Sequence, residues 1–474
     1  MNDVRSSLTF YLAVLMACGL AIFGLLHAGE ALFGIPATLT GLTAPSQLSP
    51  GLAEHLHTPL ANLLLQMIVI IVAARLVGGL FQRMGQPAVI GEIVAGILLG
   101  PSLLGLLAPQ TMNFLFPPIS LPPLHLLAEI GVLLFMFIVG MEVDAAKLRY
   151  TARSAVIISH TGIIFPFFLG VTLALATYRE LAPAAVGFAA YALFIGIAMS
   201  ITAFPVLARI LQEKNLLHSP LGQSAITCAA VDDVTAWCLL AAVIAVAKSS
   251  GLAGALQTLL LALAFIAVMF FLLRPWVERL IERKFDPGGQ NRALVAGMLV
   301  FAFAAGGFTE VIGIHSLFGA FLAGVMVPAQ SRFRLFLRDQ IETFGTTLLM
   351  PLFFAYTGLR TQIGLLDSAQ GVLLCGVIIL VAVAGKLGGV MLAARWTGKP
   401  WRESFAIGVL MNTRGLMELV VLNIGYDLGI LTPRVFTMLV VMALVTTFMT
   451  GPLLTLALRR SPEFARALPL RAEE

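Results

Sequence analysis

Apolar runs of roughly twenty residues recur along the whole chain, and short stretches rich in proline, glycine and charge separate them. A helix of about 20 apolar residues crosses the roughly 30 Å hydrocarbon core of a bilayer, whereas a membrane barrel needs alternating segments of about 10 residues. The chain lacks such alternating segments. Lipid offers no partners to backbone N–H and C=O groups, so only helices or closed barrels span it. The pattern therefore predicts an all-α integral membrane protein.

We predict fourteen spans, or thirteen if the first is a cleaved signal peptide rather than a retained helix. They cover residues 8–28, 61–81, 87–107, 123–142, 154–177, 183–208, 223–247, 252–273, 293–309, 313–329, 343–361, 370–394, 403–426 and 434–458. The domains that follow are an extra N-terminal helix and external loop at 1–60, a membrane domain at 61–460 and a short cytoplasmic tail at 461–474.

Lys and Arg are distributed unequally between alternate loops. Of the 29 such residues, one set of loops holds 22 and the other holds 4, while 3 lie inside spans. The positive-inside rule places the richer loops and both termini in the cytoplasm. The net charge of +5 then reflects topology, because no basic run is long enough to indicate nucleic-acid binding.

Composition agrees with this class of protein. The chain is 59% hydrophobic and 11% charged, whereas soluble domains carry about 25% charged residues. All four cysteines fall inside predicted spans, at Cys18, Cys228, Cys238 and Cys375. They therefore predict neither a disulfide framework nor a metal site.

Few ionisable residues fall inside the predicted spans, and such residues usually line a pathway or form a site. Asp232 and Asp233 lie near the middle of their span, and no Lys or Arg occurs from 215 to 247. Two adjacent carboxylates are too costly in lipid without a use, so we interpret this step as functional. Other ionisable residues that lie away from the ends of their spans are Arg75, Glu92, Glu129, His160, Lys386, Arg414 and Glu418.

Several of these polar residues have a simpler interpretation. We expect Glu92, Glu129 and His160 to pack or bond structurally, because helix bundles contain polar contacts of this kind. Glu310 and His315 flank a short external turn, where we expect them to contact water.

The remaining charges can be paired by position. Lys386 is the only Lys inside a span and is expected to pair with Asp232, which would cancel part of both desolvation costs. Arg414 and Glu418 are four residues apart and can meet on one helix face. Neighbouring helix positions point about 100° apart, so Asp233 cannot easily share the partner of Asp232. An unpaired buried carboxylate binds either a proton or a metal cation.

Two spans carry signals that interrupt a helix. In "FIGIAMSITAFPVLARIL", Pro205 lacks an N–H and disfavours helix before it, while Ser200 and Thr202 can bond freed backbone groups. In "MNTRGLMEL", Asn412 and Thr413 interrupt an apolar span that continues through the Arg414 and Glu418 pair. Two interrupted helices in different halves of a transporter indicate a substrate site.

The order of these features suggests an inverted repeat. The first break lies one span before the Asp pair, in span six, and the second lies one span after Lys386, in span thirteen. An odd separation makes the two breaks run in opposite directions through the bilayer, as an inverted repeat requires.

Seven motifs occur in order between residues 60 and 460: "GEIVAGILLGPSLLG", "LAEIGVLLFMFIVGMEVD", "MSITAFPVLARIL", "AAVDDVTAW", "GIHSLFGAFLAGVMVP", "MPLFFAYTGLRT" and "LMNTRGLMELVVLNIG". Together they resemble the monovalent cation:proton antiporter-2 family, which includes the plant cation/proton exchangers and the bacterial Kef-type and Nap-type Na⁺(K⁺)/H⁺ antiporters. The resemblance implies a core bundle with two broken, crossing helices, a separate dimerisation bundle, and an elevator-like movement of the core.

The resemblance also implies roles for individual residues. Asp233 matches the Asp that binds the monovalent cation and the proton, and Asp232 matches the preceding position, which varies between Asp, Asn and Gln. Lys386 matches the Lys one span before the second break, while Ser200 and Thr202 match the first crossover. The Asp-Asp form resembles bacterial electrogenic Na⁺/H⁺ members, since plant exchangers usually have Asn first. The nucleotide-binding domain that Kef-type proteins append is not expected here.

We therefore predict a secondary active antiporter, not an enzyme, which exchanges Na⁺ or K⁺ for H⁺ by alternating access at the Asp site without a cofactor. The Asp232 and Lys386 pair is a second candidate proton site. The alternative is a cation channel or channel-like K⁺ efflux protein. Na⁺ and K⁺ both accept carboxylate and carbonyl oxygens, so either fits. We expect a homodimer in a bacterial inner membrane, with both termini cytoplasmic.

Overall fold

The computed structural model describes residues 58–142, 153–214, 216, 219–248, 252–328 and 331–458. The predicted first span at 8–28 and the predicted tail at 461–474 lie outside these ranges. Every regular element in the described ranges is helical. The fold class is therefore the predicted one, an all-α membrane protein.

The helices of the first half are α3 (Pro59–Arg83), α4 (Ala88–Leu99), α5 (Leu104–Leu107), α6 (Pro109–Leu115), α7 (Leu121–Glu142), α9 (Arg153–Leu181), α10 (Phe188–Ser200), α11 (Phe204–Glu213) and α12 (Pro220–Lys248). Those of the second half are α13 (Leu252–Val268), α14 (Arg274–Lys284), α15 (Arg292–Val311), α16 (Ser316–Val325), α17 (Arg332–Phe344), α18 (Met350–Arg360), α19 (Ala369–Val383), α20 (Gly389–Trp396), α21 (Trp401–Met411), α22 (Leu416–Asp427) and α23 (Pro433–Leu458).

Ten helical stretches among the described residues are long and apolar enough to cross a membrane, and the bent pair α21 and α22 makes an eleventh. These eleven correspond to eleven of the predicted spans. The predicted spans 313–329 and 343–361 have no counterpart among these eleven stretches. The helix α16 has only 10 residues, and α17 joins α18 through a π-helical turn at Gly345–Leu349. Gly and Pro bound the apolar run of α16, whereas the helical stretch from α17 to α18 begins with the charged sequence RFRLFLRDQIETF.

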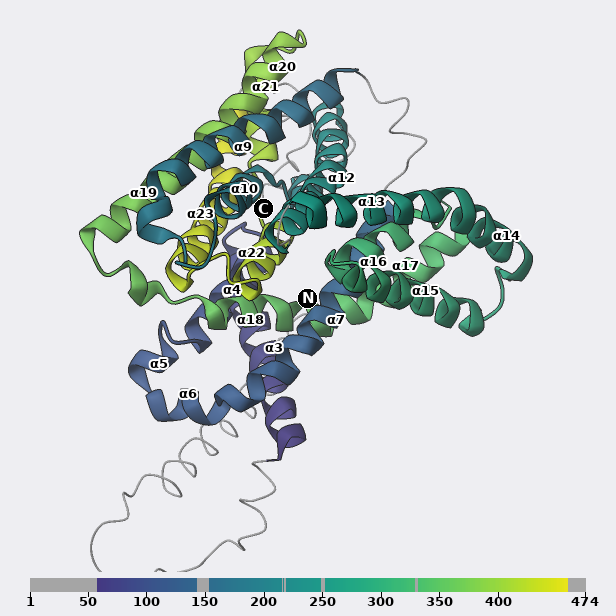
Figure 1. The fold of residues 1–474 in the computed structure, drawn as a ribbon, viewed down its shortest axis with the longest axis horizontal. Helices are drawn as coiled ribbons and strands as arrows, with labels where there is room; N and C mark the ends of the chain where they lie inside the picture. The colour runs from purple at the N-terminus through teal and green to yellow at the C-terminus, as the bar shows by residue number, and fades with distance from the viewer. Residues whose placement is uncertain are drawn as a thin grey trace, which may run out of the picture.

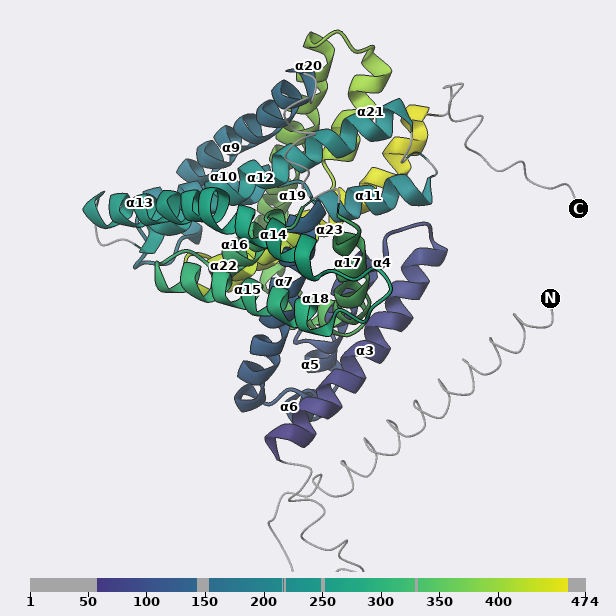
Figure 2. The ribbon, with the colours of Figure 1, turned by 90° about the vertical axis from the view of Figure 1, so that its right-hand side faces the viewer.

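The helices pack in two groups (Figure 1, Figure 2). We call the first group the flanking bundle; it consists of α3, α4, α7, α15, α16, α17 and α18. We call the second group the broken-helix bundle; it consists of α9, α10, α11, α12, α19, α20, α21, α22 and α23. The stretch α13–α14 leads from the second group back to the first. Most helix packing lies within a group rather than between the two.

Close helix contacts inside the flanking bundle depend on glycine. A Cβ atom added to Gly140 of α7 would lie 2.0 Å from the Phe321 carbonyl oxygen of α16. One added to Gly96 of α4 would lie 2.4 Å from the Ala355 carbonyl oxygen of α18. Small residues let helix backbones approach closely in membranes, where no hydrophobic force drives helices together. These contacts make the flanking bundle a tightly packed body.

Candidate ion-binding site

The first predicted break is present between α10 and α11. The helix ends at Ser200, the backbone is extended at Ile201 and Ala203, and α11 begins at Phe204. Pro205 takes the second position of α11, where its missing N–H costs no helical hydrogen bond. A proline inside the apolar run therefore ends one helix and starts the next.

The second break lies between α21 and α22, whose axes differ by 43°. It meets the first break directly. The backbone N–H of Ala203 donates to the Thr413 carbonyl at 2.9 Å, and the Thr202 hydroxyl donates to the Met411 carbonyl at 2.9 Å. Each unwound segment thus supplies partners for backbone groups that the other leaves free, which is necessary in a membrane interior.

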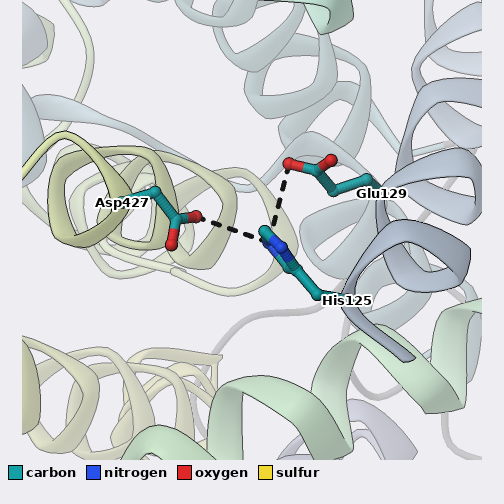
Figure 3. Close-up of side chains that lie close together, drawn as sticks. All are labelled: His125, Glu129 and Asp427. Atoms are coloured by element: carbon teal, nitrogen blue, oxygen red, sulfur yellow. Dashed lines mark ion pairs between the residues drawn. The ribbon is translucent and has the colours of Figure 1, made fainter. Parts of the chain in front are cut away.

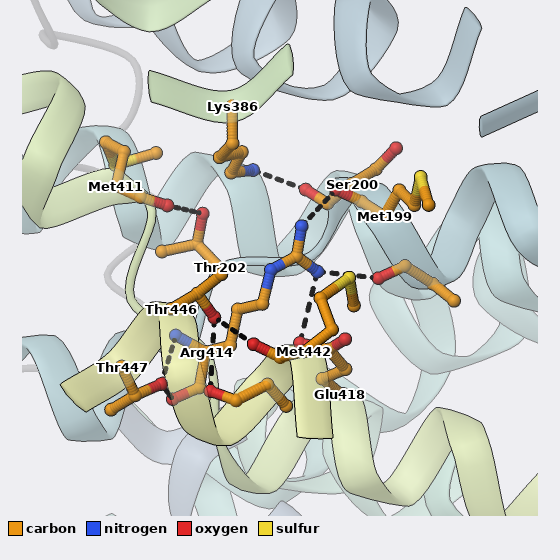
Figure 4. A network of polar contacts seen from close by, with 12 residues as sticks. Met199, Ser200, Thr202, Lys386, Met411, Arg414, Glu418, Met442, Thr446 and Thr447 are labelled. Atoms are coloured by element: carbon orange, nitrogen blue, oxygen red, sulfur yellow. Dashed lines mark hydrogen bonds and ion pairs between the residues drawn. The ribbon is translucent and has the colours of Figure 1, made fainter. Parts of the chain in front are cut away.

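Lys386 and Asp232 form the predicted ion pair beside this crossing. Lys386 Nζ lies 3.0 Å from Asp232 Oδ2 and 3.3 Å from Oδ1, and both side chains are fully buried. Lys386 also donates to the Ser200 carbonyl (Figure 4), and Asp232 Oδ2 accepts the Thr202 N–H at 3.0 Å. Lys386 sits in a π-helical turn, Ala384–Gly388, a departure from α-helix often found at functional sites.

Arg414 occupies the second break and covers the end of α10. Its guanidinium donates to the carbonyls of Ala198 at 2.7 Å and Met199 at 2.6 Å, and it lies 3.1 Å from Glu418 Oε2 (Figure 4). Its backbone exchanges hydrogen bonds with the Thr447 hydroxyl. The predicted contact with Glu418 is confirmed, but Arg414 also places positive charge at the C-terminal end of a broken helix, where it is stabilising.

Asp233 differs from its neighbour in having no side-chain partner among the described residues. It is 2% exposed, and neither carboxyl oxygen has a hydrogen bond of ordinary geometry. The backbone N–H of Phe204, the first residue of α11, acts on this carboxyl electrostatically, and so does the Lys386 charge. An unsatisfied buried carboxylate is costly, so the position suits a group that takes up a cation or a proton.

The other predicted site residues surround the crossing in different ways. The Ser200 hydroxyl turns back to the carbonyls of Gly196 and Ile163, so only its own carbonyl faces Lys386. Thr413 has its hydroxyl 3.5 Å from that of Thr450. Asn412 is buried, and its Oδ1 has no hydrogen-bond partner in the described part of the chain. The set offers oxygen ligands, which suit hard cations.

A cavity of about 1030 Å³ lies between the two bundles. Pro205 and Leu416 line it, and each follows one of the two helix breaks. Glu142 also lines it and lies within Coulombic range of Asp233. The charged residues along its walls are Arg75, Glu92, Glu142, Arg209, Arg338 and Glu342. Of these, the sequence pattern marks Arg75 and Glu92 as ionisable residues inside spans, whereas Glu142, Arg209, Arg338 and Glu342 lie near span ends or in loops and are not singled out.

The opposite end of the boundary is closed by a charged cluster. Asp427, the last residue of α22, lies 2.7 Å from the Arg360 guanidinium and 3.4 Å from His125 Nε2. Arg360 also donates to Asn423 Oδ1 at 3.1 Å. These contacts join α7 and α18 of the flanking bundle to α22 of the broken-helix bundle. The site is therefore approached by space from one side and sealed by ion pairs on the other.

Comparison with known proteins gives a consistent picture. A family model described as "Sodium/hydrogen exchanger, transmembrane" matches residues 68–460. The Na(+)/H(+) antiporter NhaS4 of Synechocystis is 44% identical over 396 residues, which cover 82% of this chain and 96% of that protein. Cation/H(+) antiporter 17 of Arabidopsis thaliana is 40% identical over 84% of this chain. K(+)/H(+) antiporter 1 of Saccharomyces cerevisiae is 34% identical over 84% of it.

The match covers different shares of these relatives. It spans 48% of the Arabidopsis protein and 46% of the yeast protein, so the chain corresponds to about half of each. Among solved structures, the sodium proton antiporter MjNhaP1 of Methanocaldococcus jannaschii at pH 8 superposes with a TM-score of 0.59. That superposition covers 85% of this chain and 98% of the other at 14% identity. The likeness to MjNhaP1 shows a shared fold.

Proposed function

Since the chain belongs to the sodium/hydrogen exchanger family, we propose that Asp233 is the group at which a monovalent cation and a proton compete for one site. The chain is a secondary transporter and not an enzyme, and exchange of a cation for protons is the activity that its relatives support. The observation that carries the proposal is the contrast at adjacent positions: Asp232 is paired with Lys386, whereas Asp233 is buried and has no side-chain partner among the described residues.

Competition follows from the cost of burial. An ionised carboxylate without water or a partner is unstable, and either a bound cation or a bound proton removes that cost. Both ligands use the same oxygens, so the site holds one of them at a time. Movement of either loaded form across the membrane, but not of the empty form, gives exchange.

The Asp232 and Lys386 pair supports the site from the other side of the crossing. The charges of this pair partly cancel. The pair therefore holds the unwound end of α10 in place while adding little net charge. We propose that arrival of a cation at Asp233 weakens this pair and releases a second proton from it. The two groups would then titrate as a coupled unit.

Access to the site is proposed to alternate between the two ends of the bundle boundary. The cavity lies at the end that carries Arg209 and Arg338, which the positive-inside rule places on the cytoplasmic side. The conformation is then open to the inside. Movement of the broken-helix bundle against the flanking bundle would open the other end, and this motion fits the sparse packing between them.

The transported cation is proposed to be Na⁺ or K⁺. The relatives named above include both a Na(+)/H(+) and a K(+)/H(+) antiporter. The site offers carboxylate and carbonyl oxygens, which serve either ion. We further propose that the protein works as a homodimer in a bacterial inner membrane, with both termini in the cytoplasm; the charge distribution of the loops supports the orientation.

Proteoliposomes with an internal pH dye test the proposal. Addition of Na⁺ or K⁺ to the wild-type protein is expected to drive proton movement for at least one of the two ions. In Asp233→Asn, which cannot be ionised, we expect the rate to fall at least about a hundredfold, since a step that needs this group is lost. Asp367→Asn, an exposed carboxylate in the loop before α19, is the matched control and should behave as wild type.

Two outcomes would contradict the proposal. One is full exchange in Asp233→Asn, which would remove that carboxylate from the transport step. The other is cation flux with no movement of protons in the wild type, together with unitary currents, which would indicate a channel.

A further inference from the structure

Two side chains of the cluster that seals the boundary, together with the neighbouring Glu129, make a group of three residue types that ligate metals, drawn from both bundles (Figure 3). His125 and Glu129 belong to α7, and Asp427 belongs to α22. One ligand atom from each lies within 4.8 Å of the other two. His125 Nε2 lies at the centre, 3.4 Å from Asp427 Oδ2 and 3.6 Å from Glu129 Oε1.

These separations are close to those in a zinc site. Zinc takes imidazole nitrogen and carboxylate oxygen at about 2.0–2.2 Å, usually in a tetrahedron, so two of its ligands lie about 3.4 Å apart. The two distances from His125 Nε2 already have this length. Glu129 follows His125 by four residues on one helix face. Only the distance between the two carboxylates must shorten, and the Glu129 side chain, at 41% exposure, is free to turn.

The surrounding residues hold two of the three ligands in place. The His125 ring stacks on Tyr356 with centroids 4.8 Å apart, and the Arg360 guanidinium lies 4.4 Å from the centroid of the same tyrosine. Arg360 binds Asp427 Oδ1 at 2.7 Å, which leaves Oδ2 turned toward the imidazole. Such outer contacts orient metal ligands in known sites.

Charge and space also suit a cation. Glu129 and Asp427 supply two carboxylates beside the single guanidinium of Arg360, and Glu310 acts on Glu129 as a further carboxylate. The cluster lines a cavity of about 20 Å³, which accommodates a body of about the size of one water molecule. The His125 and Asp427 side chains are 24% and 34% exposed, so the protein does not enclose the ligand atoms completely.

We propose that His125, Glu129 and Asp427 form a binding site for a divalent transition-metal ion of the zinc class, and that the bound ion locks the two bundles together. The site bridges α7 of the flanking bundle and α22 of the broken-helix bundle. The locking effect rests on the proposed function, because it requires that these bundles move during exchange. Binding of the metal by itself does not depend on that function.

Equilibrium dialysis of purified full-length protein against ZnCl₂ tests the site. We expect one Zn²⁺ per chain at micromolar concentrations, and at least about tenfold weaker binding in His125→Ala, Glu129→Gln and Asp427→Asn, each of which removes one ligand. Co²⁺ in place of Zn²⁺ should give the visible absorption of a tetrahedral N/O site. His160→Ala is the matched control, because His160 lies on α9 and bonds the Val156 carbonyl. No zinc binding by the wild type, or equal binding by His125→Ala, would overturn the site.

Transport measured with Zn²⁺ on both sides of the membrane tests the lock. Exchange by the wild type should fall at least about tenfold and recover when a chelator is added, whereas His125→Ala should transport without zinc and resist it. Zinc bound to the wild type without inhibition would overturn the lock. Loss of the proposed function itself would appear differently, as a wild type that exchanges no cation even in the absence of zinc.

Discussion

The two ends of the boundary between the bundles are built in opposite ways. At one end a cavity of about 1030 Å³ separates them and reaches the residues next to both helix breaks. At the other end His125, Arg360 and Asp427 tie them together around a cavity of about 20 Å³. The boundary thus combines empty space at one end with partly exposed ion pairs at the other, and a conformational change can redistribute both. The difference indicates that the boundary is where we expect the two bundles to move.

The interior of each bundle is held together by close contacts among the described residues. Inside the flanking bundle backbones touch at glycine, as at Gly96 and Gly140. Inside the broken-helix bundle the unwound segments hydrogen-bond one another, and Lys386 and Arg414 cover the end of α10. Deforming either bundle would break many contacts at once, so relative motion is expected at the boundary. The following predictions test this contrast, in order of decreasing effect.

Removal of one member of the buried ion pair should have the largest effect on stability. Lys386→Met leaves Asp232 buried without a countercharge, and such a loss lowers the free energy of unfolding by about 3–5 kcal/mol. The double variant Asp232→Asn with Lys386→Met should recover most of the lost free energy of unfolding, because no charge is then left unpaired. Thermal unfolding in detergent measures both. A single variant as stable as the double one would show that the pair does not hold the crossing together.

An added methyl group inside the flanking bundle should have the next largest effect. Gly96→Ala places a Cβ atom 2.4 Å from the Ala355 carbonyl oxygen, and overpacking of this kind lowers the free energy of unfolding by about 1–3 kcal/mol. Gly297→Ala is the matched control, since nothing lies within 4 Å of its added Cβ. Equal melting temperatures for the two variants would mean that α4 and α18 are not packed rigidly.

A change in the charged cluster of His125, Arg360 and Asp427 should change the accessibility of the large cavity at the other end of the boundary. A cysteine at Ala208, which lines the large cavity, reports its accessibility to a water-soluble maleimide in a background without the four native cysteines. Adding Asp427→Asn weakens the contacts to Arg360 and His125, so the closed end opens more often and labelling should slow several-fold. The reporter with Asp367→Asn should label as before. Faster labelling with Asp427→Asn would contradict the coupling of the two ends.

Asp232→Asn should have the smallest effect on the rate of exchange. Asparagine still accepts hydrogen bonds from the Thr202 N–H and from Lys386, so the folded protein keeps the geometry of the crossing even though the loss of the countercharge of Lys386 lowers its stability. We expect a rate within about threefold of wild type but a changed charge movement per cycle, measured as current on a solid-supported membrane. An inactive but folded variant would assign Asp232 a role beyond a paired proton site.

Much of this fold could be predicted from local sequence. Spans follow from apolar length, and Pro205 and Asn412 indicate the breaks because one lacks an N–H and the other interrupts an apolar run. The pairing of Asp232 with Lys386 could be predicted because few ionisable groups are present in the spans, so each has few possible partners. The contact between Arg414 and Glu418 could also be predicted, because residues four apart lie on one helix face.

The remaining features depend on packing over long sequence distances. Arg414 binds the carbonyls of Ala198 and Met199, which any helix of suitable position could offer. The expected structural residue Glu129 and the unremarked His125 come together with Asp427 only because α7 and α22 meet. Glu92 likewise faces the cavity only because the bundles are set apart there. No local pattern distinguishes these residues from ordinary polar contacts.

Proton release on cation binding tests the central claim most directly. Purified protein in weakly buffered detergent solution at slightly acidic pH is titrated with NaCl or KCl, with choline chloride as the control for ionic strength, and released protons are measured with a pH dye. Wild type is expected to release protons with Na⁺ or K⁺ but not with choline, and Asp233→Asn to release far fewer. Equal release from both proteins would contradict competition at Asp233.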